Sequence, residues 1–305
     1  MTATTLEWFG CTTFRVRSGA TTIMLDAYLD RTEAAAQPGV GVDDITEADW
    51  IVVGHAHFDH LWGAERIAAR TGATIIASHE SVRVMAEQGV PTAQLLPVAG
   101  GERVELAPGI AVRVFPSLHS ALWSVGPHLV GFRADQELRG DQGLTVQQIA
   151  ERQRSYDAAR RAMPSEVIAH IAAGMQGSRG DGGALIFRFE FPDGSLLFQD
   201  TSGCWSGLLP LMRSDVAILA ATARGNLDGE PYVGTLAGFV AEEAAVLQPA
   251  RVLLGHHDDW LPGFTDPIDA APVREAIAAA SPHSEFVELD YAEPYAVFAG
   301  LGDDG

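Results

Sequence analysis

Lysine is absent from this chain of 305 residues, and acidic residues outnumber basic ones by 40 to 20. The formal net charge is −20, so the surface carries a strong negative potential. Such a field repels the phosphate backbone of nucleic acids and the anionic head groups of membranes. We therefore expect a small-molecule substrate, with no nucleic acid and no membrane as a partner.

Cysteine and long apolar stretches are also scarce. Cys11 and Cys204 are too far apart in the sequence to indicate a disulfide framework, which favours a reducing compartment. No apolar run reaches the length of a membrane span. The start "MTATTLEWFG" lacks the basic and apolar regions of a secretion signal. We therefore expect a cytoplasmic protein, whose oligomeric state the sequence does not indicate.

Strand-like and helix-like segments alternate along the chain, which is 47% hydrophobic and long enough for a large core. Continuous apolar runs such as "WIVVG", "ATIIAS" and "ARVLLG" are typical of buried strands. "SHESVRVMAEQG" has helical spacing, with Ser78 placed to cap its start and Gly89 to end it. The same succession of strands and helices recurs in both halves. We predict an α+β fold in one domain that spans residues 1–305.

The segment from about residue 134 to 174 interrupts this alternation. It contains "LTVQQIAERQRSYDAARRAMPSEVIAHIAAG", which has helical spacing and is broken at Pro164. We predict a helical insertion that caps the pocket of the functional site. The alternative is a helix pair that packs elsewhere on the fold.

Six residues carry the densest cluster of metal-ligand side chains. After the apolar run "IVVG", the sequence "HAHFDH" contributes His55, His57, Asp59 and His60. Histidine and carboxylate side chains bind Zn²⁺ and similar metals. The first two histidines lie on one face if the strand continues, whereas the last two residues need a turn to reach a common site. The spacing therefore favours two metal ions, one for each pair.

Three further strand ends carry similar residues. "IAVRVFPSLH" ends at His119, "GSLLFQD" at Asp200, and "ARVLLGHH" at His256 and His257. Functional groups gather at the carboxyl ends of strands in layered α/β folds, so we expect these side chains to join the first cluster. His128 is the alternative to His119, and Asp200 has the alternative role of a turn residue. We prefer His256 to His257 because it follows its strand directly.

The segment "HAHFDH" resembles the H-x-H-x-D-H motif of the metallo-β-lactamase fold superfamily, and a histidine, an aspartate and a last histidine follow in the superfamily's order. The resemblance covers nearly the whole chain. It implies an αββα four-layer sandwich, in which two mixed sheets lie face to face with helices outside and the site at one edge. It also implies these ligands: His55, His57 and His119 for a first metal, Asp59, His60 and His256 for a second, and Asp200 as a bridge.

The start of the chain resembles the branch of that superfamily that contains L-ascorbate-6-phosphate lactonase, with N-acyl-phosphatidylethanolamine phospholipase D as a more distant relative. The matching segments are "EWFGCTTFRV" and "TIMLDAY". Cys11 stands where that branch has a histidine. Asp26 matches an aspartate at a strand end, and we predict that it either orients a ligand histidine from behind or is a turn residue.

The resemblance implies an enzyme, a dinuclear metal-dependent hydrolase of the lactonase or phosphodiesterase type. Two neighbouring metal ions generate hydroxide near neutral pH, which would attack a small-molecule ester, lactone or phosphodiester. Asp59 is the predicted catalytic residue, as a proton acceptor as well as a ligand. Zn²⁺ suits the ligands best, with Mn²⁺ or Fe as alternatives. The competing hypothesis is a non-hydrolytic metal-binding or ligand-sensing protein of the same fold.

Overall fold

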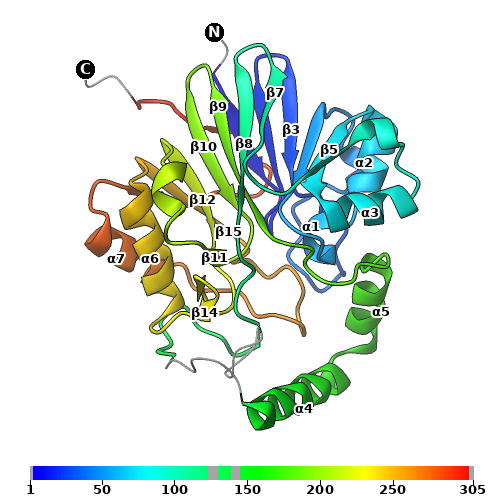
Figure 1. The fold of residues 1–305 in the computed structure, drawn as a ribbon, viewed down its shortest axis with the longest axis vertical. Helices are drawn as coiled ribbons and strands as arrows, with labels where there is room; N and C mark the ends of the chain where they lie inside the picture. Colours follow the sequence, from blue (N-terminus) through cyan, green and yellow to red (C-terminus); the bar gives the residue numbers. More distant parts are fainter. Residues whose placement is uncertain (1–2, 123–129, 139–144, 302–305) are drawn as a thin grey trace.

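Two seven-stranded sheets form the centre of the structure, a computed structural model that describes residues 3–122, 130–138 and 145–301 (Figure 1). His128, the alternative to His119, lies outside the described residues.

The first sheet has the strand order β17-β1-β2-β3-β4-β5-β6. β1, β2 and β3 pair antiparallel, and β3 to β6 run parallel. All five positions of β3 are buried, as expected of a strand that is covered on both faces. The bounds are β1 Thr5–Trp8, β2 Phe14–Ser18, β3 Thr21–Leu25, β4 Trp50–Val53, β5 Thr74–Ser78, β6 Leu95–Val98 and β17 Tyr295–Ala296.

The second sheet has the strand order β16-β15-β12-β10-β9-β8-β7. Its bounds are β7 Arg103–Ala107, β8 Ile110–Pro116, β9 Leu185–Phe191, β10 Gly194–Gln199, β12 Val216–Ala220, β15 Arg251–Gly255 and β16 Glu285–Val287. A third, small sheet contains β11 Gly203–Cys204, β13 Asn226–Leu227 and β14 Glu230–Pro231.

Helices cover the outer face of each sheet (Figure 1). The first sheet carries α1 Phe58–Leu61, α2 Ala64–Thr71 and α3 His79–Glu87, and the second carries α6 Leu236–Leu247 and α7 Ala271–Ala280. The short 3₁₀ helices are η1 Val42–Asp44, η2 Thr92–Gln94 and η3 Leu209–Met212. The predicted cap of α3 is confirmed, since the side chain of Ser78 accepts the N–H of Ser81, a contact worth about 1 kcal/mol.

Apolar side chains fill the space between these layers. One core lies between the two sheets and includes Val52 and Phe198. A second core, which includes Phe239, packs α6 and α7 on the second sheet. A third, which includes Ile67, lies between the first sheet and its helices. This order of layers confirms the αββα sandwich.

The two helices of the predicted insertion are α4 Val146–Ala162 and α5 Ser165–Gly174, and the break at Pro164 is confirmed. α5 packs against α1, so tightly that a Cβ on Gly174 would lie 2.8 Å from the ring of Trp62. Nε2 of His170 lies 2.8 Å from the hydroxyl of Tyr28. Figure 1 shows α4 extending beyond α5, away from the sheets. The insertion is therefore anchored through α5, and a capping role stays a prediction.

The topology brings the predicted strand ends to one edge of the sandwich. β10, β12 and β15 run parallel, and β8 has the same direction as β10 because both are antiparallel to β9. The carboxyl ends of β4, β8, β10 and β15 precede His55, His119, Asp200 and His256, respectively. Because parallel strands end at the same edge of a sheet, each sheet presents its polar side chains there.

Candidate metal centre

The "HAHFDH" segment leaves the sheet directly after β4. His55 follows Gly54, His57 occupies the N-cap position of α1, and Asp59 and His60 lie within that short helix. The helix supplies the turn that the spacing required. His57 is partly exposed, whereas the other three side chains are buried.

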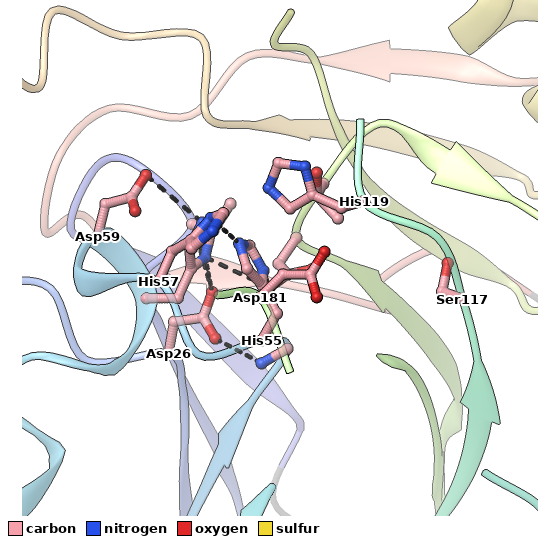
Figure 2. Close-up of polar contacts among 12 residues, drawn as sticks. Asp26, His55, His57, Asp59, Ser117, His119 and Asp181 are labelled. Atoms are coloured by element: carbon pink, nitrogen blue, oxygen red, sulfur yellow. Dashed lines mark hydrogen bonds and ion pairs between the residues drawn. The ribbon is translucent and has the colours of Figure 1, made fainter. Parts of the chain in front are cut away.

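His55, His57 and His119 form the first ligand group. Nε2 of His55 lies 3.0 Å from Nδ1 of His57, and the ring of His119 is centred 4.7 Å from each of the other two rings (Figure 2). One candidate ligand atom from each residue lies within 4.8 Å of the other two. The structure therefore brings together the three residues assigned to the first metal.

Burial keeps the first ligand group neutral. Burial lowers the pKa of His55 and of His57. It also lowers the pKa of His119, to about 4, and the nearby His57 adds to this shift. Neutral imidazole is the form that binds metals. No proton therefore competes with a metal ion at this group near neutral pH.

Asp59, His60 and His256 form the second ligand group. Nε2 of His256 lies 3.3 Å from Nε2 of His60 and 3.3 Å from Oδ2 of Asp59. Nε2 of His60 lies 3.6 Å from the same carboxylate oxygen. Three ligand atoms thus face one another at the spacing that a single ion would bridge.

Charges dominate the second ligand group. Burial would lower the pKa of His60, but Asp59, Asp26 and Asp200 outweigh it and raise that pKa to about 9. Burial would raise the pKa of Asp59, but His60 and His256 hold it below its ordinary value. The carboxylate is therefore ionised and available as a ligand.

Asp26 supports the second ligand group from behind. Its Oδ2 lies 2.7 Å from Nδ1 of His60 and accepts a hydrogen bond of 2.6 Å from the hydroxyl of Thr12. Its Oδ1 accepts the backbone N–H of Gly54 at 3.0 Å. A partner on the far nitrogen orients a ligand histidine toward its metal. The geometry fits that predicted role, which a mutation must test.

Asp200 lies between the two groups. Its Oδ2 is 2.6 Å from Nδ1 of His55 and 3.3 Å from Nδ1 of His60. Its Oδ1 is buried and has no hydrogen-bond partner among the described residues. A buried carboxylate oxygen without a partner is costly, and a bound cation would remove that cost. The residues present therefore fit divalent cations, while the bridging role of Asp200 stays a prediction.

The structure places His256, and not His257, in the second ligand group. The ring of His257 stacks on the indole of Trp8, with ring centres 4.9 Å apart and planes only 6° from parallel. Two consecutive residues thus point to different surroundings, one to the candidate site and one to an aromatic stack.

Sequence reasoning missed Asp181 and Thr12. Asp181 lies in the glycine-rich loop "SRGDGG" after α5, where its backbone oxygen accepts the N–H of Ala56 at 2.7 Å. Its carboxylate opposes the lowering of the pKa of His57 and His119, beside which it lies (Figure 2). The signals were weak: several glycines before a strand, and a threonine after Cys11.

Residues 21–137 match the family described as the beta-lactamase superfamily domain. A UPF0173 metal-dependent hydrolase of Pyrobaculum arsenaticum is 33% identical over 116 residues, which are 38% of this chain and 51% of that protein. The chain thus spans about half the length of the curated relatives it matches.

Two solved structures resemble the whole chain. Igni18, a metallo hydrolase from Ignicoccus hospitalis, superposes with a TM-score of 0.58 at 16% identity and covers 96% of this chain and 98% of its own. The metallo-β-lactamase fold protein YhfI from Bacillus subtilis superposes with a TM-score of 0.57 at 9% identity, covering 97% and 99%. At these identities the likeness concerns the fold.

Proposed function

We propose that the chain is a metal-dependent hydrolase of the metallo-β-lactamase superfamily that uses two divalent ions on a small-molecule ester, lactone or phosphodiester. The match of residues 21–137 to the superfamily's domain and the shared fold support this proposal. The observation that carries the proposal is the meeting of the two ligand groups. The rings of His55 and His60 are centred 4.0 Å apart, and Oδ2 of Asp200 contacts Nδ1 of both. Oδ1 of Asp200 has no hydrogen-bond partner in the part of the chain that the structure describes.

The chemistry divides between the ions and the chain. When bound, a pair of Zn²⁺ ions, or of Mn²⁺ or Fe, would acidify a water molecule and polarise the electrophile's oxygen. Asp59 remains ionised because His60 and His256 lower its pKa, so it can accept a hydrogen bond from the attacking water and hold it in place. The buried second ligand group excludes bulk water behind that position.

The open side of the site lies at the first ligand group. His57, His119 and Asp181 are the partly exposed members of this region, so we infer that the substrate enters beside them. α5 packs on α1, the helix that carries Asp59 and His60, which supports a role of the insertion at the rim.

Charge and family resemblance narrow the substrate class. The net charge of −20 disfavours nucleic acids, and the branch resemblance of the N-terminal segments favours lactones and phosphate esters. Among the residues that the structure describes, no helix is both long enough and apolar enough to span a bilayer.

The test combines metal analysis with a substrate panel. The native chain should bind two ions and hydrolyse at least one of the lactone, phosphodiester or thioester probes. Asp59→Asn should lower kcat/KM by about 10²- to 10⁴-fold. The control is Asp43→Asn, the same change at a side chain that is 84% exposed. Two bound ions without turnover of any probe would contradict the hydrolase and favour the metal-binding or sensing alternative.

A further inference from the structure

Cys11 lies in the loop between β1 and β2, in contact with the second ligand group. Its Sγ is 3.8 Å from Nδ1 of His256 and 3.6 Å from the backbone oxygen of Asp59. The side chain is fully buried. A thiol therefore touches two of the three residues that would hold the second ion.

The backbone fixes the position of this sulfur. Cys11 has a φ of +49°, in the left-handed region that non-glycine residues rarely adopt. Its N–H donates to Oδ1 of Asp258 at 2.8 Å, and its oxygen accepts the N–H of His256 at 2.7 Å and the indole N–H of Trp8 at 3.1 Å. Strained conformations persist where the surroundings over-determine them, and they cluster at functional sites.

The ring of His256 has two distinct edges. Nε2 faces Asp59 and His60, each at 3.3 Å, whereas Nδ1 faces Cys11. A ligand histidine binds its metal through one nitrogen and donates the other N–H to a partner, normally a carboxylate, carbonyl or water. His60 has such a partner, because its Nδ1 lies 2.7 Å from Asp26. For His256 the corresponding partner is a thiol.

We propose that Cys11 is a positioning residue for the second metal ion: its sulfur accepts the Nδ1–H of His256, and its S–H donates to the backbone oxygen of Asp59. This inference rests on the proposed metal centre. The distance of 3.6 Å from Sγ to the backbone oxygen of Asp59 is within reach of an S–H donor. Sulfur is a weak acceptor, so His256 is oriented less firmly than His60. The thiol of Cys11 thus orients the imidazole of His256, which is the less firmly held of the two histidines.

The test compares zinc-binding isotherms of the native chain, Cys11→Ala and Cys11→Asn. Alanine removes the acceptor and the donor, and the second ion should bind about tenfold more weakly while the first is unaffected. Asparagine tolerates a left-handed backbone and can both accept from His256 and donate to Asp59, so it should restore most of the affinity. The matched control is Cys204→Ala, the same change at another fully buried cysteine.

Nitrogen NMR of the zinc-loaded native chain gives a readout independent of turnover. We expect His256 to bind zinc through Nε2 and to carry a proton on Nδ1. Binding through Nδ1, or a sulfur-to-metal charge-transfer band in the Co²⁺-loaded protein, would overturn the proposal by making Cys11 a ligand.

Equal zinc affinity in the native chain and Cys11→Ala would also overturn it. Should Cys11→Ala fail to fold, the asparagine variant and the NMR of the native chain still decide. A native chain that binds no ion refutes the proposed metal centre itself, which is a different result from equal affinities.

Discussion

The two ligand groups of the candidate site differ in exposure and in charge. In the first ligand group every member is a histidine, and His57 and His119 are partly exposed. The second is buried throughout and pairs a carboxylate with two imidazoles, so that Asp59 raises the pKa of His60 while His60 lowers that of Asp59. One group is open and neutral, and the other is closed and internally paired.

The groups are also supported in different ways. In the first, His119 is held by contacts to the backbone: its Nδ1 lies 3.0 Å from the backbone oxygen of Ser120, and Asn226 donates to the backbone oxygen of His119 at 2.7 Å. In the second, His256 and the two residues that support the group, Cys11 and Asp26, all have left-handed backbones, with φ values of +66°, +49° and +53°.

This difference indicates that the two ligand groups have different roles. Strain at several converging residues persists only when tertiary contacts impose it, and such contacts hold side chains in one geometry. The second ligand group therefore has the features of a preorganised site, and the first those of the side that meets substrate. A change on one side should therefore leave the other group unaffected, unless it reaches Asp200, which contacts both.

Gly54→Ala should have the largest effect, because its new Cβ would displace Asp200, which contacts both ligand groups. A Cβ at this position would lie 1.9 Å from Oδ2 of Asp200. The buried carboxylate has to move, and we expect a loss of about 3 kcal/mol in the free energy of unfolding together with weaker binding of both ions. Urea unfolding and zinc titration measure this. Gly207→Ala is the control, since its Cβ would meet no atom of the described residues within 4 Å. If Gly54→Ala bound either ion with native affinity, Asp200 would not be shared by the two ligand groups.

The metal-free protein should lose stability at both ends of the pH range, for opposite reasons. His119 has its pKa lowered to about 4, so as pH falls below about 6.5 the unfolded chain takes up a proton that the folded one refuses. His60 has its pKa raised to about 9, so its stabilisation is complete below about 6.5 and is lost as pH rises through 9. Each of these two histidines contributes at most about 1.4 kcal/mol per pH unit.

Urea unfolding between acid and alkaline pH, in the presence of a chelator, separates these two limbs. His119→Gln should make the acid limb shallower without removing it, because His55 and His57 also have lowered pKa values. His60→Gln should make only the alkaline limb shallower. A single variant that makes both limbs shallower would show that the two ligand groups titrate as one unit. That result would contradict their separate charge states.

Asp26→Asn should weaken the second ion about 10- to 100-fold and leave the first unchanged. Asparagine accepts the left-handed backbone, and its oxygen can still accept the N–H of Gly54. Its amide then faces Thr12 and Nδ1 of His60, where only an acceptor orients the ring. Zinc isotherms measure the loss. Asp49→Asn is the matched control, because Asp49 accepts the N–H of Thr22 at the other end of β3. Equal weakening of both ions would contradict the separate support of the groups.

The layered fold and the place of the site could be predicted from the sequence because both depend on short-range patterns. Apolar runs mark buried strands, and polar residues that directly follow them mark one edge of the sheets. The runs before His55, His119 and Asp200 carried this information, and the structure brings their side chains together.

The supporting residues could not be predicted because they depend on tertiary packing. Thr12 reaches His60 across 48 positions of the sequence, and Cys11 reaches His256 across 245. No periodicity marks a left-handed residue in a loop. Asp181 comes from a loop held by two hydrogen bonds: the N–H of Ala56 donates to the oxygen of Asp181, and the hydroxyl of Ser178 donates to the oxygen of Ala56. The sequence favoured His256 over His257 only weakly, because the two are adjacent and only their distance from the end of the strand differs.

His257→Phe should have the smallest effect, whereas His256→Phe should abolish binding of the second ion. His257 stacks on Trp8 at 4.9 Å, and phenylalanine preserves an aromatic ring there, so we expect a change of less than about 1.5 kcal/mol in the free energy of unfolding and two bound ions. The same substitution one residue earlier removes Nε2, which lies 3.3 Å from Asp59. Metal stoichiometry and urea unfolding compare the pair. Loss of an ion from His257→Phe would show that His257, and not His256, is the last ligand. The aromatic stack on Trp8, rather than the thiol of Cys11, would then support the second ligand group.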